Sequence, residues 1–260
     1  MKILITGGCG YVGTILIPKL LKKNHEIVNI DTQWFGNYLP KHRNLKNYKI
    51  NLSDVSKIKE KKFNAVIHLA SIANDPMAEL DKNLSWETSA LNTFRLMNFM
   101  KKNKIRKIIY ASSGSVYGIK KEKKVTEKSS LEPISLYNKV KMITERIILS
   151  YKEIDPYIIR PATVCGFSKR MRLDVTVNAL TFSALNNGII KVHGGKQVRP
   201  NIHIDDMVKL YLFFLKSKKK NCGISERRAP PTTRAPHTTL GFRGIGHSAS
   251  CFSFKKRKKY

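Results

Sequence analysis

Short apolar runs alternate with amphipathic stretches along most of the chain. Strands are predicted at the run KILIT, which begins at Lys2, and at 26–30, 64–70, 107–113 and 155–161. Apolar residues at helical spacing predict helices at about 11–23, 85–102, 134–149 and 204–216. Strands that are apolar throughout and alternate with helices indicate a parallel sheet covered on both faces. The predicted fold class is therefore α/β, with a Rossmann-type doubly wound parallel sheet.

The composition changes near Lys220. Residues 221–254 contain no Lys, are rich in Pro, Thr, Ala, Gly and Ser, and lack a periodic apolar pattern. We therefore expect 218–260 to be an atypical, basic and disordered tail outside the fold. A shifted or fused reading frame is the other explanation of so abrupt a change, and it would leave the fold truncated.

The 260-residue chain has a formal net charge of +31, which raises the alternative of a binder of nucleic acid or another anionic surface. Outside the tail, however, the basic residues are spread along predicted surfaces and accompany no DNA- or RNA-binding motif, so nucleic-acid binding is the weaker hypothesis. No apolar run approaches the ~20 residues that span a bilayer, so no membrane partner is expected. The cysteines contain no CxxC pair, which predicts reduced thiols in the cytoplasm and no metal site.

The first strand leads into the loop TGGCGYVG at 6–13, in which Gly7, Gly10 and Gly13 form a GxxGxxG pattern. Glycines allow a tight turn and a close approach of the backbone to phosphate, and the following helix offers free N–H groups. The second strand ends at Asp31, where a carboxylate can accept hydrogen bonds from the adenosine ribose and would repel a 2′-phosphate. This pattern predicts a dinucleotide site that prefers NAD to NADP.

Four further segments extend the pattern over about residues 1–215: VIHLAS at 66–71, SSGSVYG at 112–118, YNKVK at 137–141 and VRPNIHIDD at 198–206. With the glycine loop, they make the chain resemble the NAD-dependent epimerase/dehydratase family, extended short-chain dehydrogenase/reductases that act on nucleotide sugars. The resemblance implies an NAD-binding domain at 1–165, completed by about 198–217. It also implies a partial substrate-binding region at 166–197, in which Arg172 and Asn178 have no assigned role.

The resemblance assigns catalysis to Ser113, Tyr137 and Lys141. Residues four apart share one helix face, so the Lys141 ammonium and the Tyr137 hydroxyl can face one site. A nearby ammonium favours the phenolate and is expected to lower the tyrosine pKa from its usual value of about 10. Ser113 would hydrogen-bond the reacting sugar hydroxyl, and Lys141 would also hold the nicotinamide ribose.

The resemblance further implies a set of cofactor contacts: Gly7, Gly10, Tyr11, Val12, Gly13, Asp31, Asn51, Leu52, Leu69, Ala70, Ser71, Tyr137 and Lys141. Ser113 and Arg199 are the implied substrate contacts, since a guanidinium fits a diphosphate. The chain departs from the family pattern at Ser89, where Asn is frequent, and at Pro200, where Asp is usual.

The expected reaction begins with hydride transfer from a nucleotide sugar to NAD, with Tyr137 as acid and base. The family's 4,6-dehydratases carry an Asp-Glu pair directly after the catalytic hydroxyl residue, and these positions are Gly114 and Ser115 here. That difference favours 4-epimerisation through a keto intermediate. A dehydratase or reductase of the same family, or a truncated NAD-binding protein with little activity, stays open. The family also implies a homodimer formed through the helices near 85–102 and 134–150.

Overall fold

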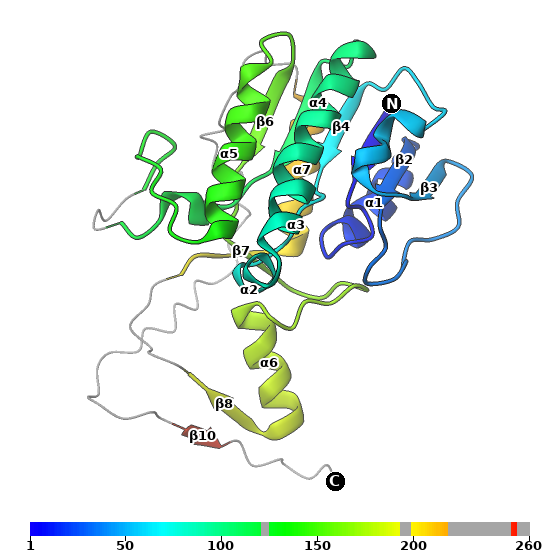
Figure 1. Ribbon diagram of the computed structural model, residues 1–260. Coiled ribbons are helices and arrows are strands. Elements are labelled where there is room, and N and C mark those ends of the chain that lie inside the picture. Colours follow the sequence, from blue (N-terminus) through cyan, green and yellow to red (C-terminus); the bar gives the residue numbers. More distant parts are fainter. Residues whose placement is uncertain (121–124, 193–198, 218–250, 254–260) are drawn as a thin grey trace.

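The computed structural model describes residues 1–120, 125–192, 199–217 and 251–253 (Figure 1). Its centre is a six-stranded parallel sheet in the order β3-β2-β1-β4-β5-β6. The strands are β1 (Lys2–Thr6), β2 (Glu26–Asp31), β3 (Leu45–Lys49), β4 (Ala65–His68), β5 (Lys107–Ala111) and β6 (Asp155–Ile159). The strand order reverses direction at β1, and such a switch point leaves a crevice at the carboxyl ends of the strands. The predicted Rossmann-type sheet is confirmed.

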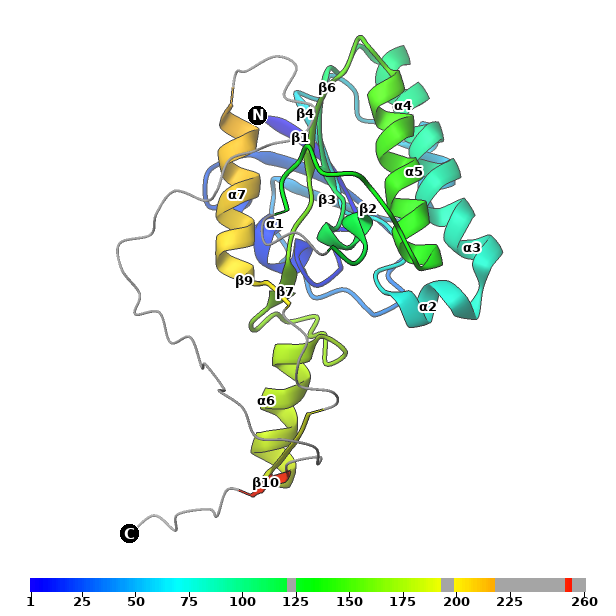
Figure 2. The same ribbon diagram turned by 90° about the vertical axis from the view of Figure 1, so that its left-hand side faces the viewer.

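Helices cover both faces of this sheet (Figure 2). On one face, α1 (Gly13–Leu21) and α7 (Ile204–Lys216) pack over Ile3 and Ile5, which are fully buried. On the other face, α4 (Asn92–Lys102) and α5 (Leu136–Ser150) pack over Leu4 and its neighbours. Because alternate strand residues point to opposite faces, two apolar layers explain why the strands are apolar throughout.

The helix predicted at 85–102 is longer and less regular than its pattern indicates. It begins as α3 (Lys82–Trp86), passes through a π-helical turn, η2 (Glu87–Leu91), and continues as α4. The short α2 (Asp75–Leu80) precedes it. Two 3-10 turns, η1 (Leu52–Lys57) and η3 (Gly114–Tyr117), follow β3 and β5. Single π turns are frequent at functional sites, and this one faces the cleft described below.

The chain between β6 and α7 contains elements that were not predicted. The short strand β7 (Thr163–Cys165) pairs in parallel with β9 (Asn201–His203), directly before α7. Between them, α6 (Thr176–Asn187) extends away from the sheet in both views (Figures 1 and 2). It leads into β8 (Ile189–Lys191), which pairs antiparallel with β10 (Cys251–Ser253). Apart from β10, the segment predicted as a disordered tail lies outside the described residues.

None of the helices in the described ranges is both long enough and apolar enough to cross a membrane.

Candidate functional site

A cleft of about 1320 Å³ opens at the carboxyl ends of the strands. It is lined by the glycine loop, by the segments that follow β2, β4 and β5, and by residues between Arg160 and Thr176. It brings together every residue that was predicted to bind or to act: Gly7, Gly10, Tyr11, Val12, Gly13, Asp31, Asn51, Leu52, Leu69, Ala70, Ser71, Ser113, Tyr137, Lys141 and Arg199. Residues that lie more than 190 positions apart in the chain therefore share one cavity.

The glycine loop is packed so tightly that two of its glycines are obligatory. Gly7 has a φ of +74°, and a Cβ there would lie 2.6 Å from the backbone nitrogen of Ala70. A Cβ on Gly13 would lie 2.3 Å from the carbonyl oxygen of Gly8. Within the described residues, the backbone N–H groups of Tyr11, Val12 and Gly13 take part in no hydrogen bond, so the start of α1 can bind a pyrophosphate. These features fit NAD.

Asp31 and Asn29 hold the loop from the end of β2. Asp31 Oδ2 accepts a hydrogen bond from the Cys9 backbone N–H at 2.9 Å, so the carboxylate faces the loop, as its place in the sequence predicts. Beneath it, the fully buried Asn29 accepts from the Gly8 N–H at 2.9 Å and donates to Asn47 Oδ1 at 2.7 Å. Sequence reasoning missed Asn29, although a polar residue inside an apolar strand could have indicated it.

Asn51, which the resemblance names as a cofactor contact, is already partly engaged by neighbouring groups. Asn51 Oδ1 already accepts from the Ser53 N–H at 3.0 Å and from Asn92 Nδ2 at 3.0 Å. Its own Nδ2 is therefore the group available to a base. Ser89, where the family often has Asn, is buried and donates to Ser71 Oγ at 3.3 Å, so it supports the cleft wall instead of lining the cleft.

Ser113, Tyr137 and Lys141 meet at the carboxyl end of β5. Lys141 Nζ donates to the Ala111 carbonyl at 2.7 Å and lies 5.8 Å from the centre of the Tyr137 ring. Ser113 Oγ lies 2.6 Å from Ser115 Oγ and is hydrogen-bonded to Tyr137. The predicted catalytic residues are thus within reach of one small group in the cleft.

Burial has the largest effect on the pKa values of Tyr137 and Lys141. Burial raises the pKa of Tyr137, and the hydrogen bond from Ser113 and the charge of Arg172 oppose that shift only in part. The expected depression of the Tyr137 pKa by Lys141 is therefore not seen in the chain by itself. Burial also lowers the pKa of Lys141 to about 7, against the opposing charge of Glu145. Lys141 is consequently poised to change its charge near neutral pH.

The side of the cleft near residues 166–178, the predicted sugar side, contains an ion pair between Arg172, which sequence reasoning named without a role, and Asp174, which it missed. Arg172 Nε donates to Asp174 Oδ1 at 3.0 Å, and Asn74 Nδ2 donates to Asp174 Oδ2 at 2.7 Å. This contact joins the segment after β4 to a segment 100 residues later. Arg199 lies exposed at the cleft margin.

Asn178 now has a structural role. It is 5% exposed, accepts from the Gly166 N–H at 2.9 Å, and donates to the Arg172 carbonyl at 2.9 Å and to Tyr11 Oη at 3.1 Å. Tyr11 Oη in turn donates to the Gly166 carbonyl at 2.6 Å. Because its hydroxyl is used here, Tyr11 can offer a cofactor its backbone N–H.

His, Cys, Asp and Glu side chains do not gather anywhere in the described part of the chain in a group of three or more that could hold a metal ion.

Comparison with known proteins identifies the family. A family model described as the NAD dependent epimerase/dehydratase family matches residues 3–224. A UDP-glucose 4-epimerase of Lactobacillus helveticus is 24% identical over 85% of this chain and 73% of its own length. An uncharacterized UDP-glucose epimerase of Bacillus subtilis (strain 168) is 32% identical over 80% of this chain and 71% of its own length. Among solved structures, a dTDP-glucose 4,6-dehydratase from Streptomyces venezuelae with NAD and TYD bound has a TM-score of 0.77 at 19% identity, covering 86% of this chain and 74% of that one, which shows the shared fold.

The family match spans most of the chain, and the cleft carries the glycine loop and the terminal acid of β2 that an NAD site needs. The chain belongs to the NAD-dependent epimerase/dehydratase family, whose members are enzymes that act with NAD.

Proposed function

We propose that this protein is an NAD-dependent 4-epimerase of a nucleotide sugar, with Tyr137 as the acid and base. The observation that carries the proposal is the meeting of Ser113, Tyr137 and Lys141 beside the glycine loop, in a cleft where positions 114 and 115 hold no carboxylate. A dehydratase or reductase of the same family is the alternative.

In this proposal, some residues bind NAD and others transfer a proton to and from the sugar. The N–H groups at the start of α1 would hold the pyrophosphate of NAD, and Asp31 would accept hydrogen bonds from its ribose. When bound, NAD supplies a reversible hydride acceptor. Tyr137 would take the proton of a sugar hydroxyl that Ser113 orients. After the keto sugar has turned its other face to the site, Tyr137 would return the proton.

The surroundings of Ser113 favour epimerisation over dehydration. Expelling water from the sugar needs an additional acid and base, which the family's dehydratases place directly after the catalytic hydroxyl residue. Here a Cβ on Gly114 would lie 3.0 Å from the Pro161 carbonyl oxygen, so that position has little room for a side chain. Ser115 carries no charge, and its hydroxyl is engaged by Ser113 and Asn138.

The substrate class follows from family membership, and its diphosphate would meet Arg199 at the cleft margin. A guanidinium can form paired hydrogen bonds with a phosphate dianion. Which nucleotide and which sugar the protein takes are best settled by a panel of substrates.

The decisive experiment is product analysis after incubation with UDP- and GDP-hexoses and NAD. We expect interconversion of the 4-epimers, and we expect Tyr137→Phe to lose turnover by about 10²–10⁴-fold while still binding NAD. A 4-keto-6-deoxy product would identify a dehydratase instead. Equal turnover by Tyr137→Phe and the unchanged protein would refute the proposed site.

We also propose a homodimer through α4 and α5, in line with the family resemblance. Leu91 and Phe94, at and after the π turn, are 53% and 48% exposed, and Ile143 on α5 is 37% exposed. Sedimentation velocity of the unchanged protein and of Phe94→Lys tests this, since a monomer in both would contradict it. A cytoplasmic location stays a prediction.

A further inference from the structure

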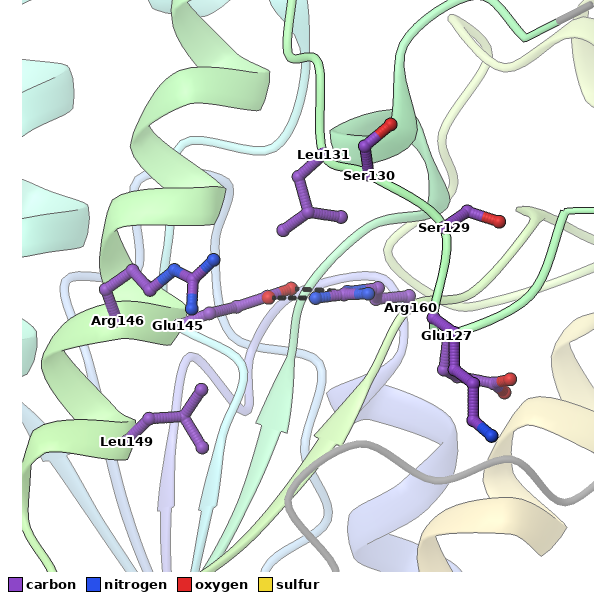
Figure 3. A pocket seen from close by; sticks show the side chains of 9 residues that line it. Glu127, Ser129, Ser130, Leu131, Glu145, Arg146, Leu149 and Arg160 are labelled. Carbon is purple, nitrogen blue, oxygen red and sulfur yellow. Dashed lines mark hydrogen bonds and ion pairs between the residues drawn. The ribbon is translucent and has the colours of Figure 1, made fainter.

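A buried carboxylate lies directly behind the proton-transfer site. Glu145 follows Lys141 by one helical turn on α5, and its side chain is 2% exposed. Arg160, directly after β6, donates from Nε to Glu145 Oε1 at 2.9 Å and from Nη2 to Oε2 at 2.6 Å (Figure 3). Ser112 Oγ, at the end of β5, donates to the same carboxylate. One side chain thus ties the catalytic helix to the residues that directly follow β5 and the edge strand β6.

Arg160 carries this connection onward to the cleft. Its Nη1 donates to Tyr117 Oη at 2.9 Å, and its guanidinium lies 4.9 Å from the centre of the Tyr117 ring. Tyr117 ends the turn η3, which begins at Gly114 next to Ser113. Arg160 lines the cleft and also a second cavity of about 350 Å³, whose walls include Glu145, Arg146 and Leu149 (Figure 3). The ion pair therefore connects the helix that carries Tyr137 with the turn that begins next to Ser113.

Few charged groups face Lys141. The titratable groups around it are His68 from β4, Tyr110 from β5, Tyr137 and Glu145 from α5, Tyr211 from α7 beside Tyr137, and Arg160 beyond Glu145. His68 has a pKa of about 3, and burial raises the pKa of each of these tyrosines, so these four are neutral near pH 7. Glu145 is the carboxylate of this set, and Arg160 partly cancels its field at Lys141.

We propose that Glu145 is a positioning residue: with Arg160 it fixes Ser113 against the catalytic helix, and its negative charge favours the protonated form of the Lys141 amine. The inference rests on the proposed function for its effect on turnover. Its effect on the charge of Lys141 concerns the chain itself. The two parts can therefore be measured separately.

The two members of the pair should shift the Lys141 titration in opposite directions. Glu145→Gln removes the negative charge at almost constant size, so the pKa of Lys141 should fall by about one unit. Arg160→Gln leaves the Glu145 charge uncancelled, so the same pKa should rise. Arg146→Gln is the matched control, because it removes the exposed arginine that directly follows Glu145 on α5 and should leave the titration unchanged.

The titration is measured by ¹³C NMR of the lysine Cε in protein labelled at lysine, with the Lys141 signal assigned by its loss in Lys141→Met. In parallel, the alkaline limb of the kcat/KM profile is recorded with the nucleotide sugar that the panel identifies. Opposite shifts in the two pair variants support the proposal. Equal shifts in the same direction, or no shift, would overturn it. If no sugar is turned over, the proposed function fails while the NMR result still decides the role of Glu145.

Removing one partner of a buried pair can prevent folding, so Arg160→Lys provides a second test. It keeps the positive charge and loses the paired geometry. The Lys141 titration should then stay within about 0.3 pH units of the unchanged protein, since the charge is retained, while kcat falls several-fold because η3 and Ser113 are displaced. A kcat equal to that of the unchanged protein would overturn the positioning role, and a clear shift of the titration would overturn the charge role.

Discussion

Replacement of Gly13 or of Gly10 by alanine should have different effects, although both residues belong to the glycine loop. A Cβ on Gly13 would lie 2.3 Å from the Gly8 carbonyl oxygen and 2.5 Å from Gly8 Cα, both of which are backbone atoms. A Cβ on Gly10 would meet only the Gly7 carbonyl oxygen, at 3.2 Å, and Gly10 lines the cleft. Gly13→Ala should therefore damage the fold, whereas Gly10→Ala should damage NAD binding.

The sizes of the two effects follow from these distances. Overpacking costs roughly 1–3 kcal/mol, and Gly13→Ala belongs at the upper end because backbone atoms cannot rotate away as a side chain can. At roughly 2–4 °C for each kcal/mol in a chain of this size, Tm should fall by about 6–12 °C. Gly10→Ala needs a shift of only a few tenths of an ångström in its neighbour, so Tm should change by about 3 °C or less. Its methyl group would stand where the pyrophosphate approaches, so NAD should bind at least about tenfold more weakly.

Differential scanning fluorimetry and isothermal titration calorimetry with NAD measure both effects. The comparison is informative because the same chemical change is made three residues apart. The reasoning is refuted if Gly10→Ala lowers Tm as much as Gly13→Ala does, or if Gly10→Ala binds NAD as tightly as the unchanged protein.

Three other predictions concern buried or charged groups. Asp31→Asn keeps the shape and removes the charge, so calorimetry should show roughly tenfold weaker NAD binding and a smaller preference for NAD over NADP; an unchanged preference would contradict the ribose role. Asn178→Ala removes the partners of Tyr11, Gly166 and Arg172 and should cost about 1–3 kcal/mol in urea unfolding, while a loss under about 0.5 would contradict its anchoring role. The buried His68 has its pKa lowered from 6.5 to about 3, so the unfolded state binds its proton first as the pH falls. The free energy of unfolding should therefore be about 4–5 kcal/mol higher above pH 6.5 than at pH 3, and this difference should be lost as the pH falls between these values. His68→Gln should flatten that part of the pH–stability curve.

The strands that sequence reasoning located are those buried on both faces. β1, β4 and β5 form continuous apolar runs because helices cover both sides, and this signal does not depend on distant residues. β3 was missed for the opposite reason: it is an edge strand whose five residues are exposed or half-buried, and its sequence LKNYK has no apolar run. The other edge strand, β6, was predicted because four of its five residues are buried. The short strands β7 and β9 were missed because each is defined only by pairing with the other, across a gap of 35 residues.

The sequence predicted those parts of the candidate site whose residues belong to one short motif or lie on one element. The GxxGxxG loop with Asp31, and the Tyr137–Lys141 pair on one helix face, are of this kind. The contact of Asn74 with Asp174 links residues that neither spacing nor composition connects. Glu145 lies between these cases, since its place one turn after Lys141 is visible in the sequence but its partner Arg160 is not.

The sugar side of the cleft takes its position from the cofactor loop. Tyr11 Oη donates to the Gly166 carbonyl and accepts from Asn178, while Ser168 Oγ donates to the Tyr11 carbonyl at 2.8 Å and lies 2.6 Å from Thr14 Oγ1. The segment from Gly166 to Asn178 is therefore built on the start of α1, the same turn whose N–H groups fit a pyrophosphate. We therefore expect the two ligands to be coupled: if NAD increases the affinity for a nucleotide sugar by some factor, the nucleotide sugar should increase the affinity for NAD by the same factor.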